Sequence, residues 1–404
     1  MAPIIALGCL CCLRLLGDLR LNATALIIFL GLWSAAVLLF VPTSRSVVRL
    51  FGWAILLRGV ALVLEPTLSD DIYRYIWEGH LINQGRNPYW EIPIHSDIVH
   101  WSKSHINHPD LTSIYPPGAQ FLFAGLAWVS DTVWSFSLFS TLCDLGILWI
   151  LYRRFGVCVG VWIYALHPLP IIENAGSGHM ESWAIFALML AVLYPNIRSW
   201  MLWIGGCIKL LPGVLLLASL RSWRDGLMMV ILVVALLRAF SLYAIPNGAL
   251  QYAQHWSFHG SVFPVVASVF ASPRIVIAGL WIGAVIYLVG WVRPFSRQAF
   301  WLTGLFVLLS PTVHPWYLLW VFPLAIWHKN RAWLGLCSLY PLWYVVLTTW
   351  DSQTQSWDPP MWPQWLSYGG FVMLLVLDWR ATRLSGEPAN TCRERETFDE
   401  DAVL

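Results

Sequence analysis

The sequence predicts an all-α integral membrane protein, a polytopic helical bundle of about 11 to 13 spans with a large extracytoplasmic first loop. Hydrophobic residues make up 58% of the 404 residues and charged residues only 11%, against about 45–50% and 25% in soluble proteins. With a mean hydropathy of +0.64, a soluble domain of this size would lack the charged side chains needed to cover its surface. Apolar runs recur along the chain, and one long polar segment, residues 67–117, interrupts them.

A transmembrane helix needs roughly 17 to 25 apolar residues, and several apolar runs of the chain approach or reach this length. The clear candidate spans are residues 23–41, 47–66, 133–152, 226–245, 275–292, 333–349 and 365–380. Shorter or proline-interrupted candidates are residues 2–16, 157–172, 180–195, 199–220, 299–312 and 316–328. We expect 199–220 to be a hairpin broken near the KLLP motif at 209–212, and 118–130 to lie at the membrane interface without crossing.

Arginine and lysine residues in the short loops set the predicted orientation, because these residues accumulate on the cytoplasmic side. The polar segments expected on the extracytoplasmic side are residues 67–117, 173–179, 246–274, 313–315 and 350–364. We therefore expect a multi-pass protein of the cell (inner or plasma) membrane. Its transmembrane domain covers 1–385, and an acidic cytoplasmic tail, 386–404, has the composition of a disordered segment.

The segment 67–117 is too long for a mere connector, and its densest chemistry is the motif SDDIYRYIWEG at 69–79. Ser69 can cap a helix whose acidic first turn suits the helix dipole. Asp71, Arg74, Tyr75 and Glu78 then follow the spacing of one helix face. Adjacent carboxylates perturb each other's pKa, which is typical of acid–base chemistry. The alternative is a capped, salt-bridged amphipathic helix without catalysis.

Other polar residues occur at the ends of apolar runs or within them. Lys209 is the only lysine in an apolar stretch, where a charge is costly unless it faces a cavity or a partner. Arg58 and Arg238 raise the same question, although either can pair with an acid inside the bundle. The Gly-Ser-Gly before His179 can be a phosphate cradle or a tight turn between spans.

Metal and nucleic-acid ligands receive little support from the sequence. His255 and His259 are four residues apart, but no third ligand is obvious, so no metal site is assigned. Asp70, Asp71 and Glu78 could offer oxygen ligands to a divalent ion. The net charge of +2 provides no basic patch for nucleic acid.

Five motifs in order resemble the landmarks of bacterial GT-C membrane glycosyltransferases, in particular the polyprenyl-phosphomannose-dependent mannosyltransferases (glycosyltransferase 87-like). These motifs are SDDIYRYIWEG (69–79) followed by NPY (87–89), IYPP (114–117), GSGH (176–179), KLLP (209–212), and SP (310–311) followed by WY (316–317). The chain differs at Glu78, where the family usually has Asp, and at Met180-Glu181, where it usually has Asn-Asp. These differences leave the sugar open.

The resemblance implies a GT-C fold and a defined reaction. Such an enzyme moves a single hexose, here mannose by analogy, from a polyprenyl-phosphate sugar to a lipid or glycan acceptor on the extracytoplasmic face. The reaction is an inverting single displacement with a carboxylate of the first loop as general base. By this analogy Asp71 is the base and Asp70 the second candidate. The residues expected to bind donor or substrate are Arg74, Tyr75, Glu78, Asn87, Tyr89, Tyr115, His179, Lys209, Arg238 and His314.

Two other classes of function stay open. A polytopic lipid or solute transporter or flippase would place ionisable residues near the bilayer midplane and would show paired broken helices in repeats. A scaffold protein without catalysis would not need Asp70 or Asp71. The sugar, the acceptor, the linkage, a divalent cofactor and the oligomeric state are not decided by the sequence.

Overall fold

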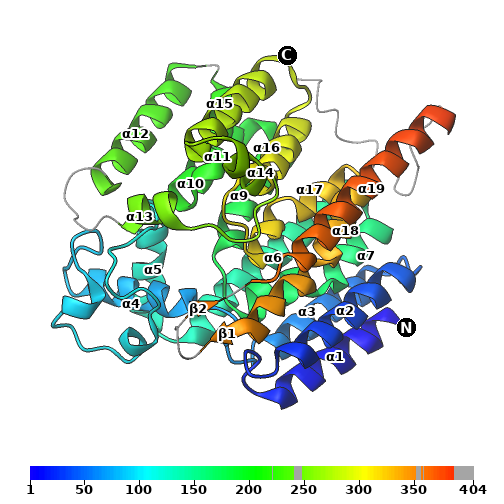
Figure 1. Cartoon of the computed structure of the whole chain (residues 1–404), viewed down its shortest axis with the longest axis horizontal. Helices are drawn as coiled ribbons and strands as arrows, with labels where there is room; N and C mark the ends of the chain where they lie inside the picture. The colour runs from blue at the N-terminus through cyan, green and yellow to red at the C-terminus, as the bar shows by residue number, and fades with distance from the viewer. Residues whose placement is uncertain (221, 241–247, 352–355, 358, 386–404) are drawn as a thin grey trace.

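A computed structural model describes residues 1–220, 222–240, 248–351, 356–357 and 359–385. The predicted tail, 386–404, and the end of the predicted span 226–245 lie outside these residues. The described chain is helical, as predicted, apart from one antiparallel pair of two-residue strands, β1 (Trp350–Asp351) and β2 (Ser356–Trp357). Figure 1 shows the helices gathered in one bundle, with the segment around α4 and α5 at one end.

The first half of the chain supplies the N-terminal helices, the polar loop and the centre of the bundle. Its helices are α1 (Ala2–Leu16), α2 (Ala23–Leu39), α3 (Val47–Ala61), α4 (Asp71–Asn83), η1 (Pro93–His95), η2 (Trp101–His105), α5 (Pro117–Val129), α6 (Val133–Phe155), α7 (Val159–Leu166), α8 (Pro168–Pro170), η3 (Ile171–Gly176), α9 (Glu181–Leu193), η4 (Pro195–Ile197), α10 (Arg198–Ile208), α11 (Leu210–Leu215) and η5 (Leu216–Ser219). α6 and α9 lie against each other in the core, where nearly every side chain of α9 is buried.

The second half surrounds this core. Its helices are α12 (Trp223–Phe240), α13 (Gly248–His255), α14 (Val262–Val269), α15 (Pro273–Trp291), α16 (Phe295–Leu309), η6 (Pro315–Trp320), α17 (Phe322–Trp327), α18 (Arg331–Ser338), η7 (Tyr340–Thr349) and α19 (Trp362–Ser385). Several predicted spans are interrupted shortly before a proline, which then lies in the first turn of the next helix, at Pro168, Pro212, Pro323 and Pro341.

Three helical runs in the described residues are long and apolar enough to cross a membrane, namely α6, α15 and the run Arg331–Thr349. Other apolar helices have 10–17 residues, so the number of 11 to 13 spans stays a prediction. Large apolar side chains cover the outer faces of α2, α12, α15 and α19, for example Leu32, Val230, Ile282 and Met373. A soluble monomer rarely exposes so much contiguous apolar surface, whereas a lipid-facing surface is apolar.

Two questions that the sequence raised about the bundle interior are answered by the structure. Arg58 pairs with Asp144 at 2.6 Å, and both side chains are fully buried. The segment 199–220 breaks at Lys209, which is extended between α10 and α11. These two helices fold back on each other with Gly206 facing Gly213, where an added Cβ on Gly206 would lie only 2.7 Å from the Gly213 Cα. The prediction that 118–130 does not cross stays untested, but its helix, α5, packs along α4.

Candidate active site

A cavity of about 1400 Å³ lies where most of the segments predicted to face the extracytoplasmic side meet. Charged side chains from α4, α9 and the α10–α11 break line one part of it, and aromatic side chains from α13, η6 and η7 line another. The predicted site residues in the lining are Asp70, Asp71, Arg74, Tyr115, Lys209 and His314. A cavity with both charged and aromatic walls suits a ligand that carries a polar head on an apolar body.

Asp71 is the first residue of α4, and its amide donates to the Ser69 hydroxyl at 3.3 Å. Its carboxylate lines the cavity and is 24% exposed. Burial, and next the negative charge of Glu181, raise the pKa of Asp71 from 3.8 to about 6, while Lys209 opposes this shift. Asp71 is therefore a stronger base than an ordinary carboxylate and is still mostly ionised at neutral pH.

Asp70 has a different environment from its neighbour. Its carboxylate forms a 2.5 Å ion pair with Arg20, which comes from the connection between α1 and α2. This pair holds the start of α4 against the N-terminal helices, because it links residues 50 positions apart. Both acids line the cavity, but the carboxylate of Asp70 is held by the Arg20 guanidinium whereas that of Asp71 has no arginine or lysine of the described residues within ion-pair distance.

Lys209 lies in the break between α10 and α11, and its side chain is 25% exposed at the cavity wall. Its ammonium forms a 2.8 Å ion pair with Glu181, the first residue of α9, and lies 5.9 Å from the centre of the Tyr115 ring. In the sequence, Glu181 differs from the residue usual in the resembling family, and no local pattern indicates that it faces Lys209. The pair places one positive and one negative side chain beside Asp71.

His179 is buried behind the Asp71 carboxylate instead of lining the cavity. Its Nδ1 lies 3.8 Å from Asp71 Oδ2, and its Nε2 lies 3.7 Å from Glu173 Oε2. Its ring stacks on Trp316 with centroids 3.9 Å apart. Neither ring nitrogen has a hydrogen-bond partner, and burial lowers its pKa well below 6.5. A neutral imidazole in this position packs behind Asp71 without adding a positive charge beside its carboxylate.

Gly178 explains how the chain reaches this arrangement. Its φ of 70° is favourable only for glycine, and an added Cβ would collide with the Ile72 side chain on α4. The Gly-Ser-Gly segment is therefore a tight turn packed on α4. The cradle interpretation receives no support from this geometry.

His314 extends the aromatic wall from the other side. Its ring stacks on Trp316 at 4.5 Å and on Phe258 at 5.1 Å. Burial lowers the pKa of His314 to about 3, so this ring is neutral. His314 therefore lines the cavity as a polar aromatic surface and not as a cation.

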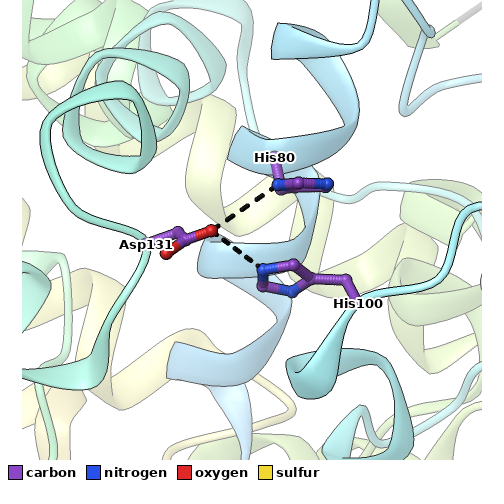
Figure 2. Close-up of side chains that lie close together, drawn as sticks. All are labelled: His80, His100 and Asp131. Carbon is purple, nitrogen blue, oxygen red and sulfur yellow. Dashed lines mark hydrogen bonds and ion pairs between the residues drawn. The ribbon is translucent and has the colours of Figure 1, made fainter.

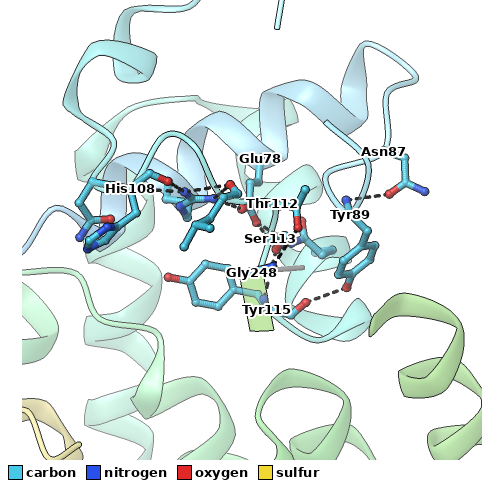
Figure 3. A network of polar contacts seen from close by, with 12 residues as sticks. Glu78, Asn87, Tyr89, His108, Thr112, Ser113, Tyr115 and Gly248 are labelled. Atoms are coloured by element: carbon cyan, nitrogen blue, oxygen red, sulfur yellow. Dashed lines mark hydrogen bonds and ion pairs between the residues drawn. The ribbon is translucent and has the colours of Figure 1, made fainter. Parts of the chain in front are cut away.

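Arg74 and Glu78 form a buried network beside the cavity. Arg74 lines the cavity, but its guanidinium donates to the carbonyls of residues 107, 108 and 111 and pairs with Glu78 at 3.3 Å. Glu78 accepts from Ser113 at 2.8 Å and from Gln120 at 2.5 Å. Figure 3 shows Glu78, Ser113 and His108 within this network. Arg74 thus holds the loop to α4, and Glu78 does not reach the cavity.

The remaining predicted residues are divided between the loop framework and the surface. Tyr75 is buried against Tyr115 and Phe123. Asn87 accepts the amide of Tyr89 at 2.9 Å, and the Tyr89 hydroxyl donates to the Tyr115 carbonyl at 2.7 Å (Figure 3). Tyr75, Asn87 and Tyr89 therefore stabilise the loop and do not line the cavity.

Arg238 is not brought to the site. It is exposed near the end of α12 and is absent from the cavity wall. Its expected role in binding donor or substrate is therefore not supported by its position. No signal in the sequence showed which face of α12 it occupies.

Residues that the sequence did not select complete the site. α13 contributes Tyr252, and Trp256 follows directly after this helix. The first amide of α13, at Gly248, donates to the Thr112 hydroxyl at 3.2 Å (Figure 3). Trp256 packs on His108 with ring centroids 4.8 Å apart. The contact between α13 and the first loop joins residues far apart in the chain, and no local pattern indicates it.

The acids of the first motif do not form a cation site in this arrangement. Asp70 is paired with Arg20, Asp71 faces the cavity, and Glu78 is held by Ser113 and Gln120. Within the described residues, no three metal-ligating side chains converge at the cavity. The pair His255 and His259 has separate surroundings, with His259 stacked on Trp343.

Comparisons with known proteins do not assign this chain to a family. No protein-family model, curated protein or solved structure matches this chain.

Proposed function

We propose that this protein is a multi-pass membrane glycosyltransferase of GT-C type that transfers one hexose, mannose as the first candidate, from a polyprenyl-phosphate donor to a lipid or glycan acceptor. The observation that carries the proposal is the Asp71 carboxylate beside the Lys209–Glu181 ion pair in one cavity with aromatic walls. A base, a cation and an apolar surface are what this transfer requires in one place.

The chemistry assigned to these groups is a single displacement. Asp71 removes the proton of the acceptor hydroxyl, and the hydroxyl oxygen attacks the anomeric carbon of the sugar from the face opposite the phosphate. The bond between that carbon and the phosphate oxygen breaks, and the lipid phosphate leaves with the electron pair. The product has the inverted anomeric configuration. General-base assistance of this kind contributes about 10²–10⁴-fold to the rate.

Lys209 is the group best placed to stabilise the departing phosphate. Its ammonium is within the cavity wall and is already held in position by Glu181. A preorganised charge does not have to reorient during the reaction, so it stabilises developing negative charge efficiently. The aromatic side chains Trp256, Phe258 and Trp316 offer flat apolar surfaces for the sugar ring or the polyprenyl chain.

The location of the site supports an extracytoplasmic reaction in the cell membrane. The predicted extracytoplasmic segments 67–117, 246–274, 313–315 and 350–364 all contribute residues to the cavity wall. Segment 173–179 lies directly behind it through His179. Segments assigned to one side by the distribution of basic residues therefore also meet in space.

The alternative of a transporter or flippase receives less support. It calls for ionisable residues that are available to a substrate within the bundle. The buried charges Arg58 and Asp144 are instead paired with each other, and Asp144 also accepts from Tyr164 at 2.6 Å.

The proposal is tested by sugar transfer in proteoliposomes. Purified protein is supplied with radiolabelled polyprenyl-phosphate mannose and a lipid extract from its host, and then with other polyprenyl-phosphate hexoses. We expect the label to appear in a new lipid or glycan product. Label that crosses the vesicle membrane while remaining on the donor would instead indicate the flippase.

A further inference from the structure

Three side chains that could hold a metal ion meet outside the cavity, on the outer side of the first loop. His80 is near the end of α4, His100 immediately precedes η2, and Asp131 lies between α5 and α6. Figure 2 shows the two imidazoles and the carboxylate pointing toward one another. Among the described residues, this is the one group of three such side chains whose ligand atoms all lie within 4.8 Å of each other.

Two distances between the ligand atoms are close to those around a tetrahedral ion, and the His80 and His100 rings stack with centroids 4.2 Å apart. Asp131 Oδ2 lies 3.1 Å from His100 Nε2 and 3.7 Å from His80 Nδ1. Ligands at the usual zinc distances of about 2.0–2.2 Å stand about 3.3–3.5 Å apart in a tetrahedron. The Asp131 carboxylate is thus already at ligand distance from both imidazoles, and rotation of the stacked imidazole side chains would direct all three atoms to one ion.

The surroundings of the ligands fix their orientation. The other nitrogen of His100, Nδ1, lies 2.9 Å from the buried hydroxyl of Ser102 and 3.4 Å from the Ser102 amide nitrogen, so Nε2 is directed toward Asp131. The Trp101 indole donates to the backbone carbonyl of Asp131 at 3.2 Å and so fixes the main chain there. With a metal ion at Nε2, His100 carries its proton on Nδ1 and donates it to the Ser102 hydroxyl, a hydrogen bond of the kind that stands behind imidazole ligands in metal sites.

Exposure at the site leaves room for a further ligand from solvent. The side chain of Asp131 is 43% exposed and that of His80 24%, whereas His100 is 6% exposed. Two imidazoles and one carboxylate are a donor set that favours zinc and related transition ions over magnesium or calcium. None of the three residues lines the cavity, so the site is separate from the proposed chemistry.

We propose that His80, His100 and Asp131 bind one divalent transition-metal ion, zinc by preference, with solvent at the fourth position. The ion links three segments of the first loop region, the end of α4, the segment before η2 and the α5–α6 turn. It thereby holds the outer part of the loop over the framework that positions Asp71.

The test uses the full chain purified in detergent with any histidine tag removed. After treatment with a chelator, the protein is titrated with zinc against a chromophoric competitor, and zinc content is measured by elemental analysis. We expect saturation at one zinc per chain. Replacement of the buried Ser102 by Ala is expected to weaken binding about 10- to 100-fold, and His100→Ala, His80→Ala and Asp131→Asn to weaken it further.

The matched control is His95→Ala, since His95 is an exposed histidine of the same loop outside the cluster. It is expected to bind zinc like the native chain. Cobalt in place of zinc is expected to give visible absorption typical of four-coordinate geometry, which His100→Ala abolishes. Absence of saturable binding, or equal zinc affinity in native protein and His100→Ala, would overturn the proposal. Transfer activity does not enter these readouts, so they are independent of the proposed reaction.

Discussion

Lys209 and Glu181 form a 2.8 Å ion pair at the wall of the cavity, although they belong to different helical segments of the chain. Lys209 occupies the break between α10 and α11, and Glu181 begins α9, where its carboxylate also meets the positive end of the helix dipole. This relationship explains why a lysine is tolerated within an apolar stretch. It also places a cation and an anion beside Asp71, whose pKa responds to both in opposite directions.

Loss of the Lys209 charge is predicted to slow transfer strongly. Because the ammonium is assigned to the departing phosphate, Lys209→Met is expected to lower kcat about 10²- to 10³-fold, the usual effect of removing one preorganised donor from an active site. Lys209→Arg should retain part of the rate. Initial rates in proteoliposomes give the measurement, with Lys103→Met as a control, since Lys103 donates to the Ser96 carbonyl away from the cavity. Equal losses in both lysine variants would contradict the assignment.

The rate of transfer is predicted to rise with pH through about 6 and then level off. Asp71 must be ionised to accept a proton, and its pKa is raised to about 6. Since Glu181 contributes to that rise, Glu181→Gln is expected to move the midpoint of the kcat/KM profile to lower pH. An unchanged midpoint in this variant would argue against Asp71 as the titrating group.

The raised pKa of Asp71 is predicted to make the folded protein less stable as the pH rises, whereas the transfer rate increases. Unfolded Asp71 titrates near 3.8 and folded Asp71 near 6, so the folded chain binds the proton more tightly. The contribution of this group to stability is present below the unfolded pKa and is lost as the pH rises through the folded one. Thermal unfolding in detergent between these pH values is expected to show a smaller decline in Tm for Asp71→Asn than for the native chain.

Loss of one member of the buried Arg58–Asp144 pair is predicted to destabilise the fold more than loss of both. Asp144→Ala leaves the Arg58 guanidinium buried without its partner, which typically costs about 3–5 kcal/mol. Replacement of both by Leu removes both charges and is expected to cost much less. Unfolding midpoints of the single and double variants decide this point, and a double variant less stable than Asp144→Ala would contradict it.

The turn before His179 is predicted to require glycine. Gly178→Ala places a Cβ in a left-handed conformation and against Ile72, which costs about 1–3 kcal/mol for the backbone alone. It also displaces His179 behind Asp71, so both Tm and transfer are expected to fall. Gly125→Ala is the matched control, because a Cβ on Gly125 meets no atom within 4 Å. A Gly178→Ala variant indistinguishable from that control would show that the turn is not constrained.

Local patterns in the sequence predicted the parts of this structure that depend on neighbouring residues. Apolar runs located the helices, Lys209 and Pro212 located the broken hairpin, and the spacing of Arg74 and Glu78 predicted their contact on one helix face. The same spacing did not reveal that Glu78 turns away from the cavity toward Ser113 and Gln120.

Pairs between distant segments could not be predicted in this way. The Arg20–Asp70 ion pair, which distinguishes Asp70 from Asp71, depends on how the connection between α1 and α2 lies against the start of α4. The cluster of His80, His100 and Asp131 joins three segments without a ligand spacing in the chain. Such contacts follow from tertiary packing and leave no periodic signal in the sequence.

The most direct test of the account compares Asp71→Asn with Asp70→Asn in the transfer assay. Both changes remove one carboxylate without altering side-chain size, and the two positions are adjacent. We predict that Asp71→Asn lowers the rate of transfer from polyprenyl-phosphate mannose, or from whichever hexose donor the native protein uses, about 10²- to 10⁴-fold. Asp70→Asn is predicted to lower the Tm, because it removes the partner of Arg20. The transfer rate of the folded Asp70→Asn enzyme is predicted to fall much less than that of Asp71→Asn. Equal transfer by native protein and Asp71→Asn would contradict the central claim.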